Sequence, residues 1–173
     1  MLRNLMSVLA VVSLFAVAGC GSTGGGSTTF FEDGSVTYSV TPINAVLTST
    51  VGTYPTSADA NTVTINPSNT PFTNSTRKSP YTVKNISVKY TKMDDANFVL
   101  TETLNSTTPM ASGGAVAIPI TIATYTIKDA LLTKGFSSST PWNFYVNASF
   151  TVSEDYSGKS YSYQVQLGTV QFK

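Results

Sequence analysis

The sequence predicts an all-β protein, an antiparallel β-sandwich of seven to nine strands with one short crossover helix. Three observations favour this fold class. The chain is rich in Thr, Tyr, Val, Ile and Phe, which suit pleated, half-buried strands. Several segments alternate apolar and polar residues with a period of two, and turn residues separate them. Strands do not alternate with helices along the chain, which argues against a parallel sheet.

The first half of the chain begins with three short predicted strands. Residues 36–40 alternate Val and Tyr with Thr and Ser, and residues 45–50 and 62–65 are two further short strands. The stretches 52–61 and 66–80 are rich in Pro, Asn, Ser and Thr, so they are predicted to be loops.

The next predicted unit is a hairpin. Residues 83–91 alternate Ile, Val and Tyr with Asn, Ser, Lys and Thr, the pattern of an antiparallel strand with one face in water. A turn over residues 93–97 leads into its partner strand, residues 98–104.

A more apolar strand is predicted over residues 115–127. Pro119 cannot donate a backbone hydrogen bond, so this strand should lie at a sheet edge or carry a bulge. The only predicted helix follows, at residues 128–134, and Gly135 should end it. So short a helix between strands fits a crossover at the end of a sandwich.

The C-terminal hairpin has the clearest pattern in the chain. Residues 144–152 and 161–167 alternate regularly, and residues 154–159 form the loop between them. After Gly168 the apolar positions change parity, which is the effect of a glycine bulge.

This closing hairpin, with its acidic, glycine-containing loop and its final Val-x-Phe, resembles the last two strands of bacterial immunoglobulin-like domains. The resemblance implies an immunoglobulin-like β-sandwich. The signature cysteines, and the tryptophan between them, are absent. Residues 30–173 are predicted to form one such domain, a size that buries enough surface for stability without disulfides.

The N-terminus has the pattern of a secretory signal peptide over residues 1–19. Arg3 is followed by an apolar run, residues 5–18, which ends at small residues. The alternative is an uncleaved membrane anchor, but the run is shorter than the roughly 20 residues that a spanning helix needs.

The sequence Val17-Ala18-Gly19-Cys20 resembles the bacterial lipobox. The resemblance implies cleavage between Gly19 and Cys20, a diacylglycerol on the Cys20 thiol and acylation of the new amine. Cys20 is the only cysteine. Aspartate after the cysteine favours the inner membrane in such lipoproteins, so Gly21 implies the outer membrane. Residues 20–29 are predicted to be the lipidated cysteine and a flexible Gly/Ser/Thr tether, about 30 Å long at full extension.

Charge and catalytic residue types are both scarce. Charged residues make up 11% of the chain, and loss of Arg3 with the signal peptide leaves nine basic and nine acidic side chains. This balance argues against nucleic acid as a partner. The chain has no histidine, and the single cysteine is predicted to carry lipid, so we expect neither an enzyme nor a cofactor, nor a metal site with histidine or cysteine ligands.

Two groups of residues remain candidates for binding. Asp94, Asp95, Glu154 and Asp155 lie in two hairpin loops, which could bind Ca²⁺ together if both loops lay at one end of the sandwich. The alternative is that all four are solvated turn residues. Trp142, Tyr145 and Tyr156 could stack on sugar rings or contact a protein partner. The alternative is that Trp142 closes the end of the core and Tyr145 covers a neighbouring strand.

The leading hypothesis is a non-enzymatic immunoglobulin-like module, lipid-anchored in the outer membrane and facing the periplasm or the cell surface. It would act in adhesion or as an accessory subunit of a cell-envelope assembly, with a protein or glycan partner. The alternative is a carbohydrate-binding surface lipoprotein that uses the three aromatic residues. A third hypothesis is a small hydrolase with an Asp or Glu catalyst.

Overall fold

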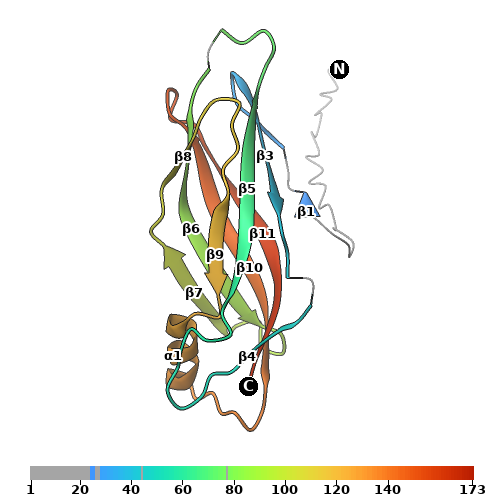
Figure 1. Ribbon diagram of the computed structural model, residues 1–173, viewed down its shortest axis with the longest axis vertical. Helices are drawn as coiled ribbons and strands as arrows, with labels where there is room; N and C mark the ends of the chain where they lie inside the picture. Colours follow the sequence, from blue (N-terminus) through green and yellow to red (C-terminus); the bar gives the residue numbers. More distant parts are fainter. Residues whose placement is uncertain (1–23, 26–27, 44, 77) are drawn as a thin grey trace, which may run out of the picture.

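The computed structural model describes residues 24–25, 28–43, 45–76 and 78–173. In this part of the chain, eleven strands form two sheets that face each other, and one short helix lies at one end (Figure 1). The predicted all-β sandwich is therefore confirmed. Four of the strands contain only two or three residues, too few to show alternation, and the remaining seven agree with the predicted seven to nine.

The first sheet has five strands. β3 (Gly34–Val40) and β5 (Asn61–Pro71) lie at its centre. β9 (Ile118–Ile122) forms one edge, and β1 (Gly24–Gly25) and β2 (Thr29–Phe30) both pair with the other side of β3.

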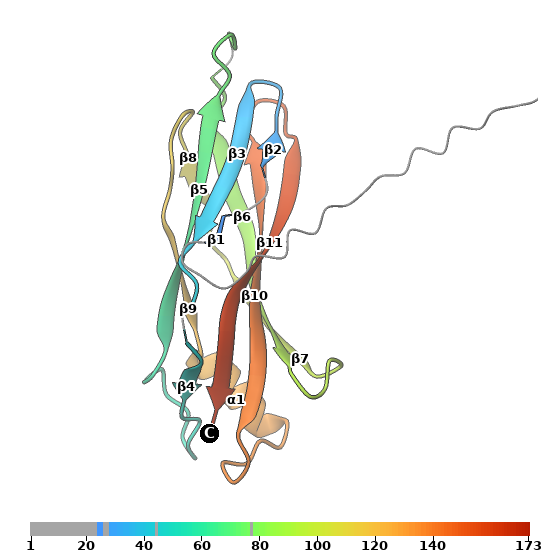
Figure 2. The same cartoon turned by 90° about the vertical axis from the view of Figure 1, so that its right-hand side faces the viewer.

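The second sheet has six strands and supplies the larger face. Its order is β4 (Leu47–Ser49), β11 (Ser160–Phe172), β10 (Trp142–Glu154), β6 (Tyr81–Lys92) and β7 (Val99–Leu104), and β8 (Thr108–Met110) also pairs with β6. β4 and β7 form opposite edges (Figure 2). β4 pairs with β11 in parallel, which corrects the prediction that all strands are antiparallel. The reason is that β4 follows a crossover from the first sheet rather than a hairpin turn.

The core lies between the two sheets and is rich in aromatic rings. Phe144 packs edge-on against Phe172, with ring centroids 5.6 Å apart. Tyr38 of β3 reaches across the sandwich to Phe150 and Tyr163, at centroid distances of 5.4 Å and 5.3 Å. These contacts hold the two sheets together without a disulfide.

β5 is longer than the sequence predicts. Residues 66–71 were expected to be loop because Pro, Asn, Ser and Thr favour turns, but they continue the strand. β3 pairs with β5 from Gly34↔Pro71 to Val40↔Ile65, so a neighbouring strand takes up the backbone hydrogen bonds of this polar segment. Asn69 is buried, and its amide Nδ2 donates to the carbonyl of Ala111 at 3.5 Å. Pairing and a side-chain hydrogen bond therefore outweigh local propensity.

The predicted strand over residues 115–127 also ends early. β9 stops at Ile122, and helix α1 (Tyr125–Thr133) starts where strand was expected. The chain turns at Ala123, whose φ is +56°, and the hydroxyl of Thr124 accepts a hydrogen bond from the amide of Ile127. Two other predictions are confirmed. Pro119 lies on an edge strand, and Gly135, with φ of +84°, follows the end of the helix.

The predicted glycine bulge at Gly168 is confirmed. Val146 pairs with Gly168 and Asn147 with Gln166, so Leu167 is the extra residue on β11. Gly168 has φ of +139°, and a Cβ placed there would lie 2.7 Å from Cβ of Ile43. The bulge lets Leu167 and Val170 both face the core.

Gly168→Ala is expected to lower the free energy of unfolding by about 2 kcal/mol, because alanine adds both backbone strain and a steric clash. Gly135→Ala is the matched control, since Gly135 also has positive φ but no atom within 4 Å of the added Cβ. It should cost about 1 kcal/mol. Urea unfolding of the two variants measures the difference. Equal losses would show that the contact with Ile43 has no energetic weight.

The predicted tether is partly paired with the domain. Gly24 and Gly25 pair with Val40 and Ser39 of β3, and Thr29 lies opposite Val36. The described part of the segment is therefore not the free coil that its composition predicts. The physical reason is that this side of β3 would otherwise expose unpaired amide and carbonyl groups.

Candidate functional site

The outer side of the six-stranded sheet carries a regular array of polar side chains. Residues of one parity on β6, β7, β10 and β11 point outward, and the strand register aligns them into three rows of four. The rows are Thr103, Ser87, Ser149 and Gln164; Thr101, Lys89, Asn147 and Gln166; and Val99, Thr91, Tyr145 and Thr169. Neighbours within a row are about 5 Å apart, and successive rows about 7 Å. We call these twelve residues the polar face.

The polar face is hollowed at its centre. The depression has a volume of about 210 Å³, and side chains from all four strands line it. On its floor the hydroxyls of Ser87 and Ser149 form a hydrogen bond of 2.8 Å. Tyr145 lies beside it and is 46% exposed, although it is large and apolar. The depression therefore combines hydroxyl and amide groups with the lysine ammonium group, and the aromatic ring of Tyr145 lies next to it.

Lys89 is the only charged residue of the polar face. Its side chain is exposed and forms no ion pair with any residue that the structure describes. No carboxylate belongs to the polar face, so its only formal charge is positive.

The three predicted aromatic residues do not form one surface. Trp142 is half-buried at the start of β10, edge-on to Phe98 and Phe136 at centroid distances of 5.3 Å, with Lys92 Nζ 4.4 Å from its ring centre. Tyr156 follows the other end of β10, and the thirteen residues of this strand span about 40 Å. Only Tyr145 lies on the polar face.

The two acidic loops lie at opposite ends of the sandwich, which corrects the expectation that they could share one cation. β6 and β10 are antiparallel, so the loop that follows β6, with Asp94 and Asp95, is far from Glu154 and Asp155 after β10. Asp94 pairs with Lys92 at 3.2 Å, and Asp95 Oδ1 accepts a hydrogen bond from the amide of Asn97. Among the described residues, no three potential ligand side chains are grouped to hold a metal ion.

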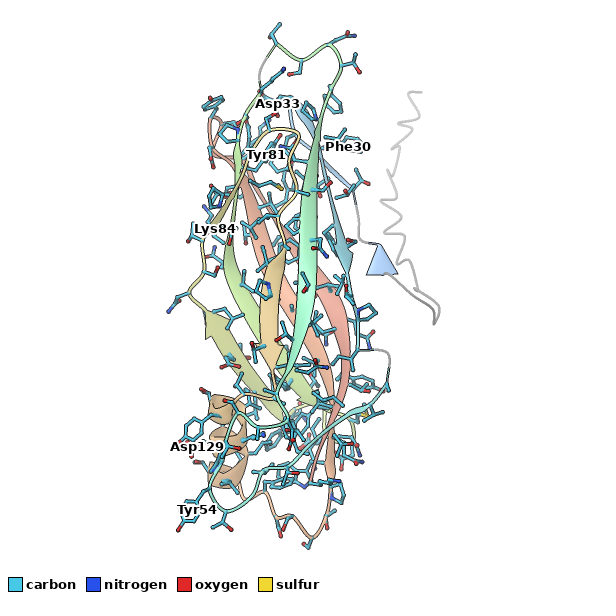
Figure 3. The ribbon with its side chains drawn as sticks, in the orientation of Figure 1. Phe30, Asp33, Tyr54, Tyr81, Lys84 and Asp129 are labelled. Carbon is cyan, nitrogen blue, oxygen red and sulfur yellow. The ribbon has the colours of Figure 1, made fainter. Side chains whose placement is uncertain are left out.

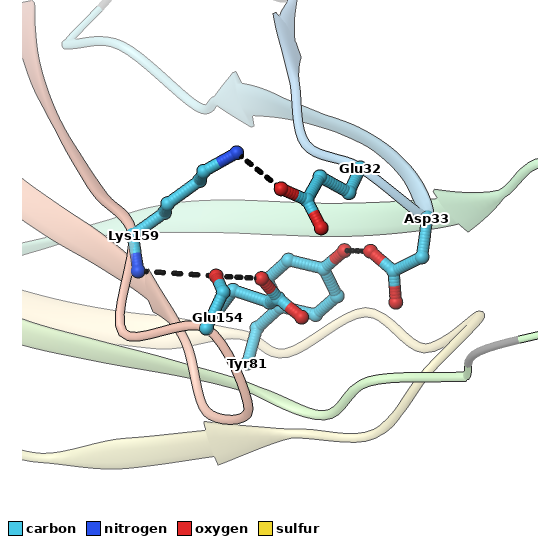
Figure 4. Close-up of polar contacts among 6 residues, drawn as sticks. Glu32, Asp33, Tyr81, Glu154 and Lys159 are labelled. Atoms are coloured by element: carbon cyan, nitrogen blue, oxygen red, sulfur yellow. Dashed lines mark hydrogen bonds and ion pairs between the residues drawn. The ribbon is translucent and has the colours of Figure 1, made fainter.

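Sequence reasoning missed a buried polar cluster at the end of the sandwich where β10 meets β11. The Asp33 carboxylate, 3% exposed, accepts a hydrogen bond from the amide of Ser79 at 2.8 Å. It also accepts one from the hydroxyl of Tyr81 at 2.7 Å (Figures 3 and 4). Burial, and then the hydrogen bond to Asp33, raises the pKa of Tyr81 above its usual range. In the sequence, Asp33-Gly34 indicates only a turn.

Glu154 belongs to the same end and is 1% exposed. Its carboxylate accepts a hydrogen bond from the hydroxyl of Ser157 within the β10–β11 loop. On the surface above it, Lys159 Nζ donates to Glu32 Oε1 at 2.6 Å, and this hydrogen bond raises the pKa of Lys159 (Figure 4). These contacts fix the loop to the segment that leads into β3.

Lys128 is a second buried polar residue that the pattern does not reveal. Its side chain is fully buried beneath α1, and Nζ donates to the carbonyl of Ala58 at 2.6 Å. Burial lowers the pKa of this ammonium group. The hydrogen bond holds the helix against the connection between β4 and β5, so its role is structural.

The residues predicted to carry the lipid anchor, Gly19 and Cys20, lie outside the described residues. Within the described ranges, no helix is long and apolar enough to cross a membrane. A comparison of the sequence with protein-family models found no match, and a comparison with curated proteins found none either.

Proposed function

We propose that this chain is a lipid-anchored, non-enzymatic binding module of the bacterial outer membrane. It would act in adhesion or as an accessory subunit of a cell-envelope assembly. The observation that carries the proposal is the polar face, an open, rigid surface with a central depression to which four strands contribute side chains. A two-layered, mostly antiparallel sandwich also supports the finer proposal that the module is immunoglobulin-like.

The use of the buried acidic residues supports binding over catalysis. A hydrolase that relied on carboxylates would need them to face substrate in a cleft. Asp33 and Glu154, the two most buried carboxylates, accept hydrogen bonds from neighbouring groups inside the fold. Their geometry suits holding loops together rather than attacking a ligand.

The lipobox sequence and the pairing of the tether together indicate how the module would be held. Because Gly24 pairs with Val40, only the four residue steps from Cys20 to Gly24 remain as a linker. Their full extension is about 14 Å. A lipid on Cys20 would thus keep the β1 edge of the first sheet close to the bilayer.

Cys20→Ser is expected to abolish lipid attachment and to move the protein from the membrane to the soluble fraction, since serine cannot form the thioether. Metabolic labelling with an alkyne fatty acid, followed by fractionation, measures both effects. Gly21→Asp is the matched control. It should keep the label but move the protein to the inner membrane. A wild-type protein that takes up no label would overturn the anchor.

A further inference from the structure

We infer that the polar face binds an acidic polysaccharide, with Lys89, Asn147 and Tyr145 holding one uronic acid residue. This inference rests on the proposed binding function and assigns it a site and a ligand class. Lys89 and Asn147 lie directly opposite each other on β6 and β10. Tyr145 is two residues from Asn147 on the same side of β10.

These three side chains match three parts of a uronic acid. The Lys89 ammonium group, which has no ion-pair partner among the described residues, would bind the sugar carboxylate. The Asn147 amide can donate to one hydroxyl and accept from another. The exposed ring of Tyr145 offers an apolar surface for the C–H side of a pyranose. Because the three residues lie on neighbouring positions of a sheet, no loop has to become ordered when the sugar binds.

The remaining residues of the polar face extend the site beyond one sugar. Gln164 and Gln166 on β11 supply further amides, and Ser149 supplies a hydroxyl that Ser87 already orients. The rows lie open on a sheet surface rather than at the bottom of a closed pocket. This arrangement suits the interior of a polymer chain rather than the end of one.

The chemistry of the polar face favours a glycan over a protein or a nucleic acid. Protein interfaces draw most of their affinity from large apolar or arginine side chains in a dry centre, whereas ten of these twelve residues are short polar groups or lysine. Nucleic acid rewards several clustered cations, and the polar face has one. None of the twelve positions carries a carboxylate that would repel an acidic glycan. The single cation, Lys89, attracts one.

The test is isothermal titration calorimetry of the full-length lipoprotein in detergent with oligogalacturonate. Fully methyl-esterified oligogalacturonate of the same length is the matched ligand, since it keeps the rings and lacks the charge. We expect the acidic oligomer to bind at least about tenfold more tightly than the ester, as a charge-assisted hydrogen bond would give.

Five variants locate the site. Lys89→Gln and Tyr145→Ala are each expected to weaken binding of the acidic oligomer about tenfold or more, and Tyr145→Phe should keep most of it. Lys134→Gln and Tyr156→Ala are the controls, because both residues are exposed and lie away from the polar face. They should change nothing. Unchanged melting temperatures would show that all variants fold.

Three results would overturn the inference. One is no binding of oligogalacturonate by the folded wild-type protein. Another is an equal loss in Lys134→Gln and Lys89→Gln, which would indicate unspecific charge attraction. The third is a photo-cross-linker at position 145 that captures a protein in cells while the oligomer fails to compete. The anchor is tested separately. Lipid labelling of Cys20 without uronate binding would remove this inference alone, and binding without labelling would remove only the anchor.

Discussion

Above pH 10 the ionisation of Tyr81 and Tyr90 is expected to lower the free energy of unfolding of the wild-type protein by about 3 kcal/mol per pH unit. Tyr81 and Tyr90 are 1% and 0% exposed, and burial is the main reason that the pKa of each lies well above its ordinary value of 10.0. In the unfolded chain both phenols ionise near pH 10, whereas in the folded protein they stay neutral. Their stabilising contribution is complete below pH 10 and is lost as the pH rises towards the folded pKa. Each tyrosine accounts for about 1.4 kcal/mol per pH unit.

Urea unfolding at intervals between pH 8 and pH 12 measures this slope. Tyr81→Phe and Tyr90→Phe should each reduce it by about 1.4 kcal/mol per pH unit, and Tyr156→Phe, at a 66% exposed position, should leave it unchanged. Lys128 acts in the opposite direction. Burial lowers the pKa of Lys128 in the folded protein. The free energy of unfolding therefore increases as the pH rises from this folded pKa to the ordinary pKa of 10.5, where the increase is complete. An unaltered slope in both Tyr81→Phe and Tyr90→Phe would show that other groups cause the loss of stability above pH 10.

Asp33→Ala is expected to lower the free energy of unfolding at pH 7 by about 3 kcal/mol. The carboxylate is the acceptor for two buried donors, the amide of Ser79 and the hydroxyl of Tyr81. Alanine would leave both without a partner, at a cost of roughly 1–3 kcal/mol each. Because Asp33 precedes β3 and Ser79 precedes β6, the contact joins the two sheets at this end. Urea unfolding measures the loss.

A double-mutant cycle separates the hydrogen bond from burial alone. The double variant Asp33→Ala/Tyr81→Phe should lose about 1 kcal/mol less free energy of unfolding than the two single variants together. The reason is that the double variant has no Tyr81 hydroxyl that could be left without an acceptor. Ser49→Ala is the control. Its hydroxyl is fully buried but has no hydrogen-bond partner among the described residues, so its removal should cost less than about 0.5 kcal/mol. Strict additivity in the cycle would contradict the assigned hydrogen bond.

Alternation with a period of two predicted correctly those strands that bury one face. Residues 83–91, 144–152 and 161–167 all lie in long strands of the six-stranded sheet. Turn composition failed as a guide at residues 66–71, and the apolar pattern failed at residues 125–127. In the first case a neighbouring strand paired with a polar segment, and in the second the cap at Thr124 outweighed an apolar run. The local sequence pattern indicates which residues of a strand are buried, but it does not show which distant segment pairs with that strand.

The candidate site depended still more on the tertiary structure. The sequence placed Tyr145 on the polar side of its strand, and the structure confirms that it is exposed. It did not show that Asn147 would lie opposite Lys89, because fifty-eight positions separate them along the chain. The bulge at Asn85, with φ of +56°, also changes the parity of β6, so that Tyr81 and Ile86 are both buried.

The sequence by itself determined the fold class, the restriction of Pro119 to a sheet edge or a bulge, the helix stop at Gly135 and the bulge at Gly168. Each of these follows from the conformational limits of single residues or from a short periodic pattern. Only the tertiary structure decided that the acidic loops lie apart, that Asp33 meets Tyr81, and that the polar face exists. These features depend on strand order and register, which are set by pairing between segments remote in the chain.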